Sequence, residues 1–260
     1  MRKESVKLFA KRRALILEEL ESKEIVKVED LSRKLGVSAV TIRKDLDIMD
    51  LDGQLERVHG GAVKINAPYQ GQLFADRANL NKAAKCQIAQ AVARLINNGE
   101  TVMLNSGTTT CYIAEALRKK SDLLVITNSL PILNTIGHCK NLVTLFLGGR
   151  YDAEHQITYD EDAVEQLSKY RVQTLILGMD GVDYASGATT NTHTSTSITK
   201  KMLECAKTKI LAADGSKIGK TALVQIAALS EFDLLVTNET AENAEMLNLI
   251  RQRGLQIVTV

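Results

Sequence analysis

The sequence predicts two domains of different fold class: a winged helix-turn-helix at residues 1–65, mostly helical with a β-hairpin, and an α/β domain with a mostly parallel sheet at 75–260. A length of 260 residues is sufficient for two domains. Apolar residues recur at helical spacing up to residue 51, and a glycine-rich segment follows them. After residue 75, short apolar runs alternate with helical segments, which is typical of strand-helix-strand units.

The overall charge does not by itself indicate a binding partner. The chain has 33 lysines and arginines against 31 aspartates and glutamates, a net charge of +2. Positive charge is concentrated at the start, where residues 1–13 contain six lysines or arginines and one glutamate. Such a run attracts phosphate groups, although a solvated helix end would have the same composition.

The four cysteines, Cys86, Cys111, Cys139 and Cys205, are dispersed along the chain. Their spacing fits neither a zinc site nor a small disulfide framework, so we expect them to be reduced and buried, with no metal or cofactor. The first residues are charged, and no apolar run approaches the roughly 18 residues that a membrane span needs. We therefore expect a cytoplasmic protein that has no membrane partner.

Three helices are expected in the first domain. The first, at residues 6–21, would bury Phe9, Ile16, Leu17 and Leu20. The second, at 28–35, is followed by Gly36 as a tight turn. The third begins after Ser38, whose hydroxyl is suited to accept from the free amides of the first turn. Its inner side is apolar, with Ala39, Ile42, Leu46 and Met49.

The outer side of the third helix indicates that it reads DNA. Val40, Thr41, Arg43 and Lys44 offer a methyl surface, a hydroxyl and two cations, which suit base edges and phosphates. We therefore predict that Ser38, Val40, Thr41, Arg43 and Lys44 bind double-stranded DNA. Because one short helix reads few base pairs, we also expect a homodimer or homotetramer.

A hairpin wing is expected next. Gly53 is suited to end the third helix, and residues 54–58 and 62–65 are expected to pair as strands around His59-Gly60-Gly61. Arg57 and His59 on this wing are predicted to contact the DNA backbone or minor groove. A purely structural three-helix bundle is the alternative, but the helix lengths, the turn and the basic outer face favour DNA binding.

The second domain follows a linker expected at 66–74, which contains Pro68 and Gly71. Strands are expected at residues 101–105, 123–127, 142–147, 173–178, 209–213, 233–237 and 256–260. Helices are expected at residues 82–96, 109–118, 131–138, 162–169, 195–206 and 241–253. Such units form a parallel sheet covered on both faces, and ligands bind beyond the carboxyl ends of its strands.

Polar residues gather after five of the expected strands. The first such loop runs from Asn105 to Thr110 and opens a helix, so its amides, glycine and hydroxyls would form an anion cradle suited to phosphate. Asp180 and Asp183 are suited to sugar hydroxyls, and Lys217 to phosphate. The predicted ligand-binding residues are Asn105, Ser106, Gly107, Thr108, Thr109, Thr110, Thr127, Asn128, Ser129, Gly148, Gly149, Asp180, Gly181, Asp183, Thr189, Thr190 and Lys217. For each of these residues considered by itself, the alternative is a structural role as a helix cap or as part of a surface ion pair.

On these residues the chain resembles the DeoR family of bacterial transcription regulators along nearly its full length. The N-terminal signature matches at Arg12, Ile16, Leu20, Ser38, Thr41, Ile42, Arg43, Lys44, Asp45 and Leu46, and the wing matches at Arg57, Val58, His59, Gly60, Gly61 and Ala62. The sensor domain matches at Ser106 to Thr109, Thr127 to Ser129, Gly148-Gly149, Asp180-Gly181 and Asp214 to Lys217. The resemblance implies a sensor similar in fold to ribose-5-phosphate isomerase.

The resemblance also implies repression of an operon for uptake and catabolism of a carbohydrate, relieved when a phosphorylated sugar or sugar alcohol binds as the effector. The chain departs from the family at Asn191 to Ser197, where many members carry acidic residues after the paired threonines. The family pattern therefore does not predict which effector this chain binds.

The likeness to an isomerase raises an alternative, an enzyme fused to a DNA-binding domain. Isomerisation of a sugar phosphate needs a base, usually a carboxylate, but this chain has no Asp or Glu between Asp183 and Glu204. His193 is the only imidazole in that interval, and a lone histidine in such a loop is more often a hydrogen-bonding group. We therefore expect no catalytic residue. A domain that only assembles subunits is a third possibility, which the anion cradle and Lys217 disfavour.

Overall fold

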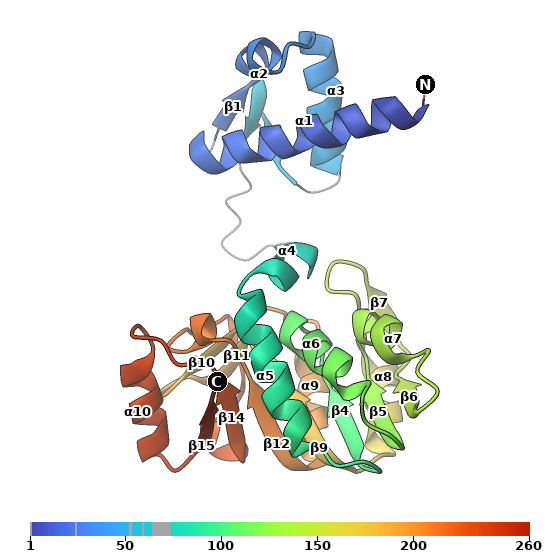
Figure 1. Cartoon of the computed structure of the whole chain (residues 1–260), viewed down its shortest axis with the longest axis vertical. Helices are drawn as coiled ribbons and strands as arrows, with labels where there is room; N and C mark the ends of the chain where they lie inside the picture. The colour runs from blue at the N-terminus through green and yellow to red at the C-terminus, as the bar shows by residue number, and fades with distance from the viewer. Residues whose placement is uncertain (1, 24, 52–53, 59, 64–73) are drawn as a thin grey trace. The chain divides into compact units, whose positions relative to one another are not determined.

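The computed structural model describes residues 2–23, 25–51, 54–58, 60–63 and 74–260. The chain divides into two compact units, Met1–Gln70 and Gly71–Val260 (Figure 1). We call them the N-terminal unit and the sensor unit. Of the linker expected at 66–74, residues 66–73 lie outside the described residues, and Phe74 is instead the first residue of a helix.

The described residues of the N-terminal unit form three helices and a three-stranded antiparallel sheet. The elements are α1 (Arg2–Lys23), β1 (Ile25–Lys27), α2 (Val28–Leu35), α3 (Ala39–Leu51), β2 (Glu56–Val58) and β3 (Gly61–Val63). β3 lies between β1 and β2 and pairs with both. The winged helix-turn-helix is thus confirmed, with an unexpected strand, β1, that is too short to show an alternating pattern. Gly53, expected to end α3, lies outside the described residues.

Local hydrogen bonds hold the turn between α2 and α3. Gly36 adopts the left-handed conformation after α2 (φ 64°), and Ser32 Oγ donates to the carbonyl oxygen of Val37 (2.6 Å). Thr41 N donates to Ser38 Oγ (3.2 Å), so Ser38 caps the first turn of α3. The apolar side of α3 then joins α1 and α2 in one core, which contains Ile16, Leu20, Leu31, Ile42, Leu46 and Met49.

Arg12 of α1 and Asp45 of α3 form a two-point ion pair inside this unit. Arg12 Nε donates to Asp45 Oδ2 (2.6 Å), and Arg12 Nη2 donates to Asp45 Oδ1 (3.1 Å). The two side chains are 19% and 6% exposed. The hydrogen bonds to Asp45 raise the pKa of Arg12 above its usual value. The pair therefore holds α1 against α3 through charge-assisted hydrogen bonds.

The sensor unit is built on a seven-stranded sheet. Its strands are β4 (Thr101–Leu104), β5 (Leu123–Thr127), β6 (Leu142–Phe146), β9 (Val172–Leu177), β12 (Ala206–Ala212), β14 (Leu234–Thr237) and β15 (Gln256–Thr259). The order across the sheet is β15-β14-β12-β9-β4-β5-β6, and every neighbouring pair is parallel. These are the strands expected from the sequence, so the α/β fold class is confirmed.

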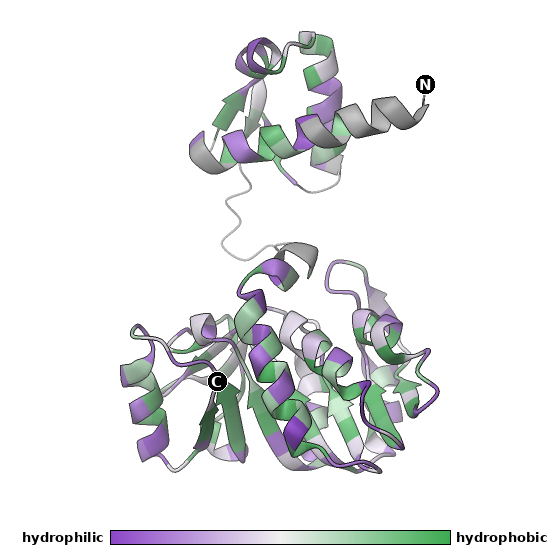
Figure 2. Ribbon diagram, in the orientation of Figure 1, coloured by the Kyte–Doolittle hydropathy of each residue, from purple (hydrophilic) through white to green (hydrophobic). Residues whose placement is uncertain are grey.

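Helices cover both faces of this sheet (Figure 1). One core lies under α5 (Lys82–Leu95), α6 (Thr108–Leu117) and α7 (Leu130–Ile136), and it includes Val102 of β4. The other lies under α8 (Glu161–Ser168), α9 (Thr196–Glu204) and α10 (Ala244–Gln252), and it includes Met103. Successive residues of β4 thus enter opposite cores, as a strand buried on both faces requires. Figure 2 shows the hydrophobic strands between these more polar helices.

Several short elements were not expected from the sequence. β7 (Arg150–Asp152) and β8 (Ile157–Tyr159) form a hairpin, and β10 (Gly181–Asp183), β11 (Gly187–Thr190) and β13 (Val224–Ala227) form a second antiparallel sheet. The helix α4 (Phe74–Asn79) and the 3-10 turns η1 (Gly215–Lys217) and η2 (Leu229–Glu231) are also new. Segments this short carry too few residues to show a period of two or of 3.6.

The cysteines are less buried than expected. Cys205 is buried, whereas Cys86, Cys111 and Cys139 are only half-buried. Cys111 of α6 and Cys139 pack against the core under α5, α6 and α7 without being fully buried. Among the described residues, no helix is both long enough and apolar enough to cross a membrane.

Replacing Arg12 by alanine should leave the Asp45 carboxylate buried without its partner. Breaking a buried ion pair in this way costs about 3–5 kcal/mol, and because Arg12 is 19% exposed we expect the lower end of that range. Urea unfolding measures the loss in free energy of unfolding, and hydrogen exchange shows whether α1 and α3 are the helices affected. Arg33→Ala is the matched control, because its ion pair with Asp30 is 80% and 62% exposed and should contribute at most about 1 kcal/mol. Equal destabilisation by both variants would contradict a special role for the Arg12–Asp45 pair.

Candidate DNA-reading face and ligand cleft

α3 presents the face that the sequence indicated. Val40, Arg43 and Lys44 are exposed on the side opposite the buried apolar residues. Thr41 is half-buried, and its Oγ1 lies 2.9 Å from Ser38 Oγ. Neither Arg43 nor Lys44 forms an ion pair or hydrogen bond with another described residue. Both cations are therefore available to phosphates and base edges.

Arg57, predicted to contact DNA from the wing, is bound within its own unit. Its Nε donates to Asp47 Oδ1 (2.8 Å), its Nη1 donates to the carbonyl oxygen of Gly61, and its main-chain N donates to Asp50 Oδ1 (3.1 Å). Arg57 thus ties β2 to α3 and to β3. His59 lies outside the described residues. A DNA contact by either residue stays a prediction.

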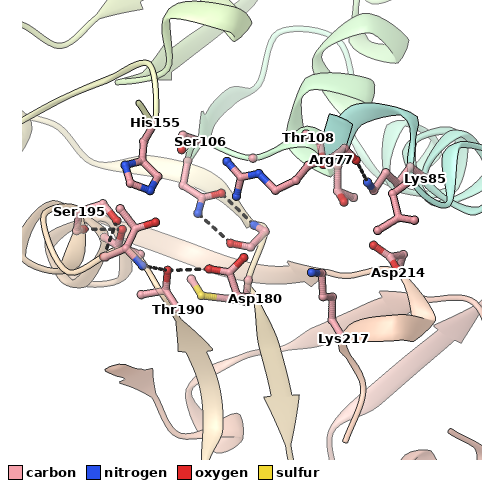
Figure 3. Close-up of a pocket in the computed structure, with 18 of the residues that line it drawn as sticks. Arg77, Lys85, Ser106, Thr108, His155, Asp180, Thr190, Ser195, Asp214 and Lys217 are labelled. Carbon is pink, nitrogen blue, oxygen red and sulfur yellow. Dashed lines mark hydrogen bonds between the residues drawn. The ribbon is translucent and has the colours of Figure 1, made fainter. Parts of the chain in front are cut away.

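The sensor unit contains a cleft at the carboxyl ends of its central strands (Figure 3). The loops after β4, β9 and β12 meet there, because these strands are adjacent and parallel. Of the residues predicted to bind a ligand, those that line the cleft are Asn105, Ser106, Gly107, Thr108, Thr109, Asn128, Asp180, Thr190 and Lys217.

Three cations line one side of the cleft. Lys217 belongs to η1, Lys85 to α5 and Arg77 to α4; all three line the cleft (Figure 3), and the charges of Lys217 and Arg77 both lower the pKa of Lys85. α6 begins at Thr108, so the amides of its first turn are at this end of the cleft and have no partner within the helix. An anion placed there would interact with both the amides and the cations.

Lys85 is buried in spite of its charge. Its Nζ donates to the carbonyl oxygen of Arg77. Burial lowers the pKa of Lys85, Asp214 opposes this, and Lys217 and Arg77 lower it further, so that the net pKa is below the usual lysine value. Asp214 also accepts a hydrogen bond from Asn81 Nδ2 (2.8 Å). This end of the cleft therefore holds three cations against one carboxylate.

The other end of the cleft offers carboxylate, hydroxyl and imidazole groups. Asp180 Oδ2 accepts from Thr190 Oγ1 (3.1 Å) and from Asn191 N (2.9 Å). His155, from the turn between β7 and β8, lies opposite Lys217 across the cleft (Figure 3). Its Nδ1 is 2.9 Å from Asp152 Oδ2. These groups are suited to the hydroxyls of a sugar or polyol.

Asn105 lines the cleft, but its side-chain amide already has partners. Asn105 Nδ2 donates to the carbonyl oxygen of Gly178 (2.9 Å), and Gly178 N donates to Asn105 Oδ1 (2.8 Å). This reciprocal pair joins the end of β4 to the end of β9. Asn105 is therefore a positioning residue in the floor of the cleft.

The other predicted ligand-binding residues do not line the cleft; they are Thr110, Thr127, Ser129, Gly148, Gly149, Gly181, Asp183 and Thr189. At two of the glycines, the neighbouring main chain leaves no room for a side chain. A Cβ on Gly149 would lie 2.5 Å from the carbonyl oxygen of Tyr159, and one on Gly181 would lie 2.4 Å from that of Lys220. Asp183 Oδ1 instead accepts from the main-chain N of the two turn residues Ala185 and Ser186 (2.9 Å each).

The remaining lining residues were not in the predicted set; they are Arg77, Leu80, Lys85, His155, Gly178, Met179, Thr192, Ser195, Thr199 and Asp214. Arg77 and Lys85 come before the first strand of the large sheet. The sequence prediction considered only residues that follow a strand, so it did not include them. His155 belongs to an unexpected hairpin. Asp214 begins the loop that contains Lys217. The sequence analysis had already matched this loop to the sensor domain, so Asp214 could have been predicted as a lining residue.

His193, the imidazole considered for catalysis, is exposed and does not line the cleft. The nearest acidic residues on either side in the sequence, Asp183 and Glu204, also lie away from the cleft lining. The described residues contain no group of three or more His, Cys, Asp or Glu side chains that could hold a metal ion. The residues that do line the cleft, cations at one end and carboxylate, hydroxyl and imidazole groups at the other, have chemistry suited to an anionic, hydroxylated molecule.

Lys85 should lose its proton at a lower pH than an ordinary lysine, because burial disfavours its charged form. NMR titration of the full-length protein with labelled lysine ε-carbons measures this pKa, and the Lys85→Arg variant identifies the signal. Inorganic phosphate should raise the pKa again, since an anion in the cleft stabilises the ammonium. A Lys85 pKa at or above the ordinary value would contradict the burial and the cationic surroundings described above.

Comparison with known proteins relates both units to one family. The family model for the DeoR-like helix-turn-helix domain matches residues 12–67, and that for the DeoR C terminal sensor domain matches residues 80–239. A protein of Escherichia coli O157:H7 named for repression of the aga operon is 32% identical over 253 residues, which cover 96% of this chain and 94% of its own. The HTH-type transcriptional repressor GlcR of Bacillus subtilis is 30% identical over 243 residues, which cover 94% of this chain and 93% of its own.

A more distant likeness is seen among solved structures. Ribose 5-phosphate isomerase A from Methanocaldococcus jannaschii is 18% identical, with a TM-score of 0.39 over 54% of this chain and 56% of its own. The two domain models, by contrast, cover both units, and the two relatives match nearly the full length of the chain. The chain therefore belongs to the DeoR family, and it is a DNA-binding transcription regulator rather than an enzyme.

Proposed function

We propose that this protein represses an operon for the uptake or catabolism of a carbohydrate, and that a phosphorylated sugar or sugar alcohol relieves the repression. The observation that carries the proposal is the cleft, which has three cations and a helix N-terminus at one end and hydroxyl and carboxylate groups at the other. A molecule with a phosphate at one end and hydroxyls along its length fits this division. The names of two relatives, both given as repressors, support the direction of control.

The phosphate of this effector would lie over Ser106–Thr109 and beside Lys217. Its hydroxyls would then extend toward Asp180 and Thr190. Asp180 uses Oδ2 for its hydrogen bonds within the protein, and Oδ1 has no partner among the described residues. This oxygen remains able to accept a hydrogen bond from a sugar hydroxyl.

Control of DNA binding would act through the assembly of subunits in the cytoplasm. A homodimer or homotetramer places two α3 helices on one operator, and the spacing of the helices must match the spacing of the half-sites. Effector binding would favour an arrangement in which this spacing no longer fits. A coupling free energy of about 1–3 kcal/mol is sufficient for such control.

A panel of phosphorylated sugars and sugar alcohols tests the proposal with the full-length protein. A compound present at about 100 times its Kd stabilises a protein by about 2.7 kcal/mol, which produces a measurable thermal shift. The same compound should release the protein from promoter DNA taken from its own chromosome. Chemical conversion of the compound, or no response to the whole panel, would contradict the proposal.

Replacing Arg43 by alanine should weaken operator binding by about 1–3 kcal/mol if the guanidinium makes a two-point contact with a base. Fluorescence anisotropy with operator and scrambled duplexes measures both the affinity and the discrimination between them. Lys119→Ala, which removes an exposed cation from the sensor unit, controls for the change in net charge. Unchanged operator affinity in Arg43→Ala would remove Arg43 from the DNA-reading face.

Replacing Lys217 by alanine should leave operator binding intact and abolish the response to effector, because this lysine lines the cleft and lies outside the N-terminal unit. The measurement is operator affinity with and without the compound that stabilises the wild-type protein. Loss of operator binding with normal effector affinity would instead give Lys217 a structural role.

A further inference from the structure

The outer side of α3 carries an acid as well as two cations. Asp47 lies one turn beyond Arg43 and Lys44 on the same side of the helix. Its side chain is 61% exposed. DNA is densely negative, so a carboxylate without a partner at this position would oppose the binding of any duplex. The negative charge of Asp47 must therefore be neutralised if this side of α3 is to bind DNA.

Arg57 of β2 supplies the neutralising charge. Its Nε donates to Asp47 Oδ1 (2.8 Å), and its Nη1 donates to the carbonyl oxygen of Gly61 in β3. Its main-chain N donates to Asp50 Oδ1 (3.1 Å), a second carboxylate of α3. The Arg57 side chain is only 25% exposed. One arginine thus links both strands of the hairpin to the helix that reads DNA.

The orientation of the hairpin against α3 depends on these hydrogen bonds. Leu55 and Ala62 join Met49 in the core of the N-terminal unit, but the burial of apolar surface has no preferred direction. Hydrogen bonds do have one. Among the described residues, every hydrogen bond that joins β2 or β3 to α3 is made by Arg57. Loss of its side-chain bonds would therefore leave the hairpin attached but less precisely oriented.

We infer that Arg57 is a positioning residue for DNA recognition, which neutralises Asp47 and orients the hairpin against α3 instead of binding DNA itself. The sequence predicted a direct contact from the wing. Such a contact would require the guanidinium to leave Asp47 and Gly61, and it would place an unpaired carboxylate beside the DNA phosphates. In the positioning role the planar guanidinium keeps both acceptors at once, which a point charge could not do.

Replacing Asp47 by alanine separates the two roles of Arg57. The probes are a chromosomal promoter duplex that the full-length wild-type protein protects from nuclease cleavage and a duplex of the same bases in scrambled order. If Arg57 acts through Asp47, the ratio of the two affinities should fall about fivefold, although loss of an acid favours binding to both duplexes. If Arg57 bound DNA, the same change would free it and the ratio would not fall. Asp30→Ala, which breaks the exposed ion pair of α2 with Arg33, should keep the wild-type ratio.

Variants of Arg57 give a second, independent measurement. Arg57→Ala should lower the ratio as Asp47→Ala does, and the double variant should lower it no further, because both changes remove one interaction. The slope of log affinity against log salt concentration should stay at the wild-type value in Arg57→Ala, whereas loss of a phosphate contact would reduce it by about one. Arg57→Lys keeps the charge but not the planar fork, and it should not restore the ratio.

Thermal unfolding shows whether each variant is folded. Because Asp47 is largely exposed, Asp47→Ala should unfold close to the wild-type temperature, so this variant carries the test even if Arg57→Ala does not fold. An unchanged or higher ratio in Asp47→Ala would overturn the inference. A reduced salt slope in folded Arg57→Ala would overturn it as well, and it would make Arg57 a phosphate contact. Equal affinity of the wild-type protein for both duplexes would contradict the DNA-reading face, and the inference with it.

Discussion

In the sensor unit all strands of the large sheet run in the same direction, and the loops after β4, β9 and β12 therefore come together at one edge. The reciprocal hydrogen bonds between Asn105 and Gly178 join two of these strand ends. Side chains that follow directly, such as Ser106 and Asp180, are attached to a main chain that is already fixed. A ligand that binds there need not order the loops first, which reduces the entropic cost of binding.

The N-terminal unit keeps its binding face rigid by a different arrangement of polar groups. The Arg12–Asp45 pair joins α1 to the inner side of α3, and Arg57 joins the wing to the same helix through Asp47. Asp47 is exposed and lies on the outer side of α3, one turn beyond Lys44. Arg43 and Lys44 take no part in either interaction, so the cations of the DNA-reading face remain available.

Much of the fold could be predicted from the sequence, because long buried elements give clear periodic signals, as β9 and α5 do. The cleft could be predicted only in part. Arg77 and Lys85 reach it from helices that precede the sheet, and no rule about strand ends applies to them. Gly149 and Gly181 were predicted to bind the ligand because they belong to the loops that follow expected strands. In both cases the main chain approaches another part of the protein, and a glycine needed for such packing looks the same in a sequence as one that approaches a ligand.

The outer face of α3 also bears on how such a regulator diversifies. Val40 is 71% exposed, and neither Arg43 nor Lys44 has a partner among the described residues. Exchanges at such surface positions usually alter folding free energy by no more than about 0.5 kcal/mol. After gene duplication, one copy could therefore acquire a new target sequence through a few mutations on this face, while its fold and its metabolite response are inherited unchanged.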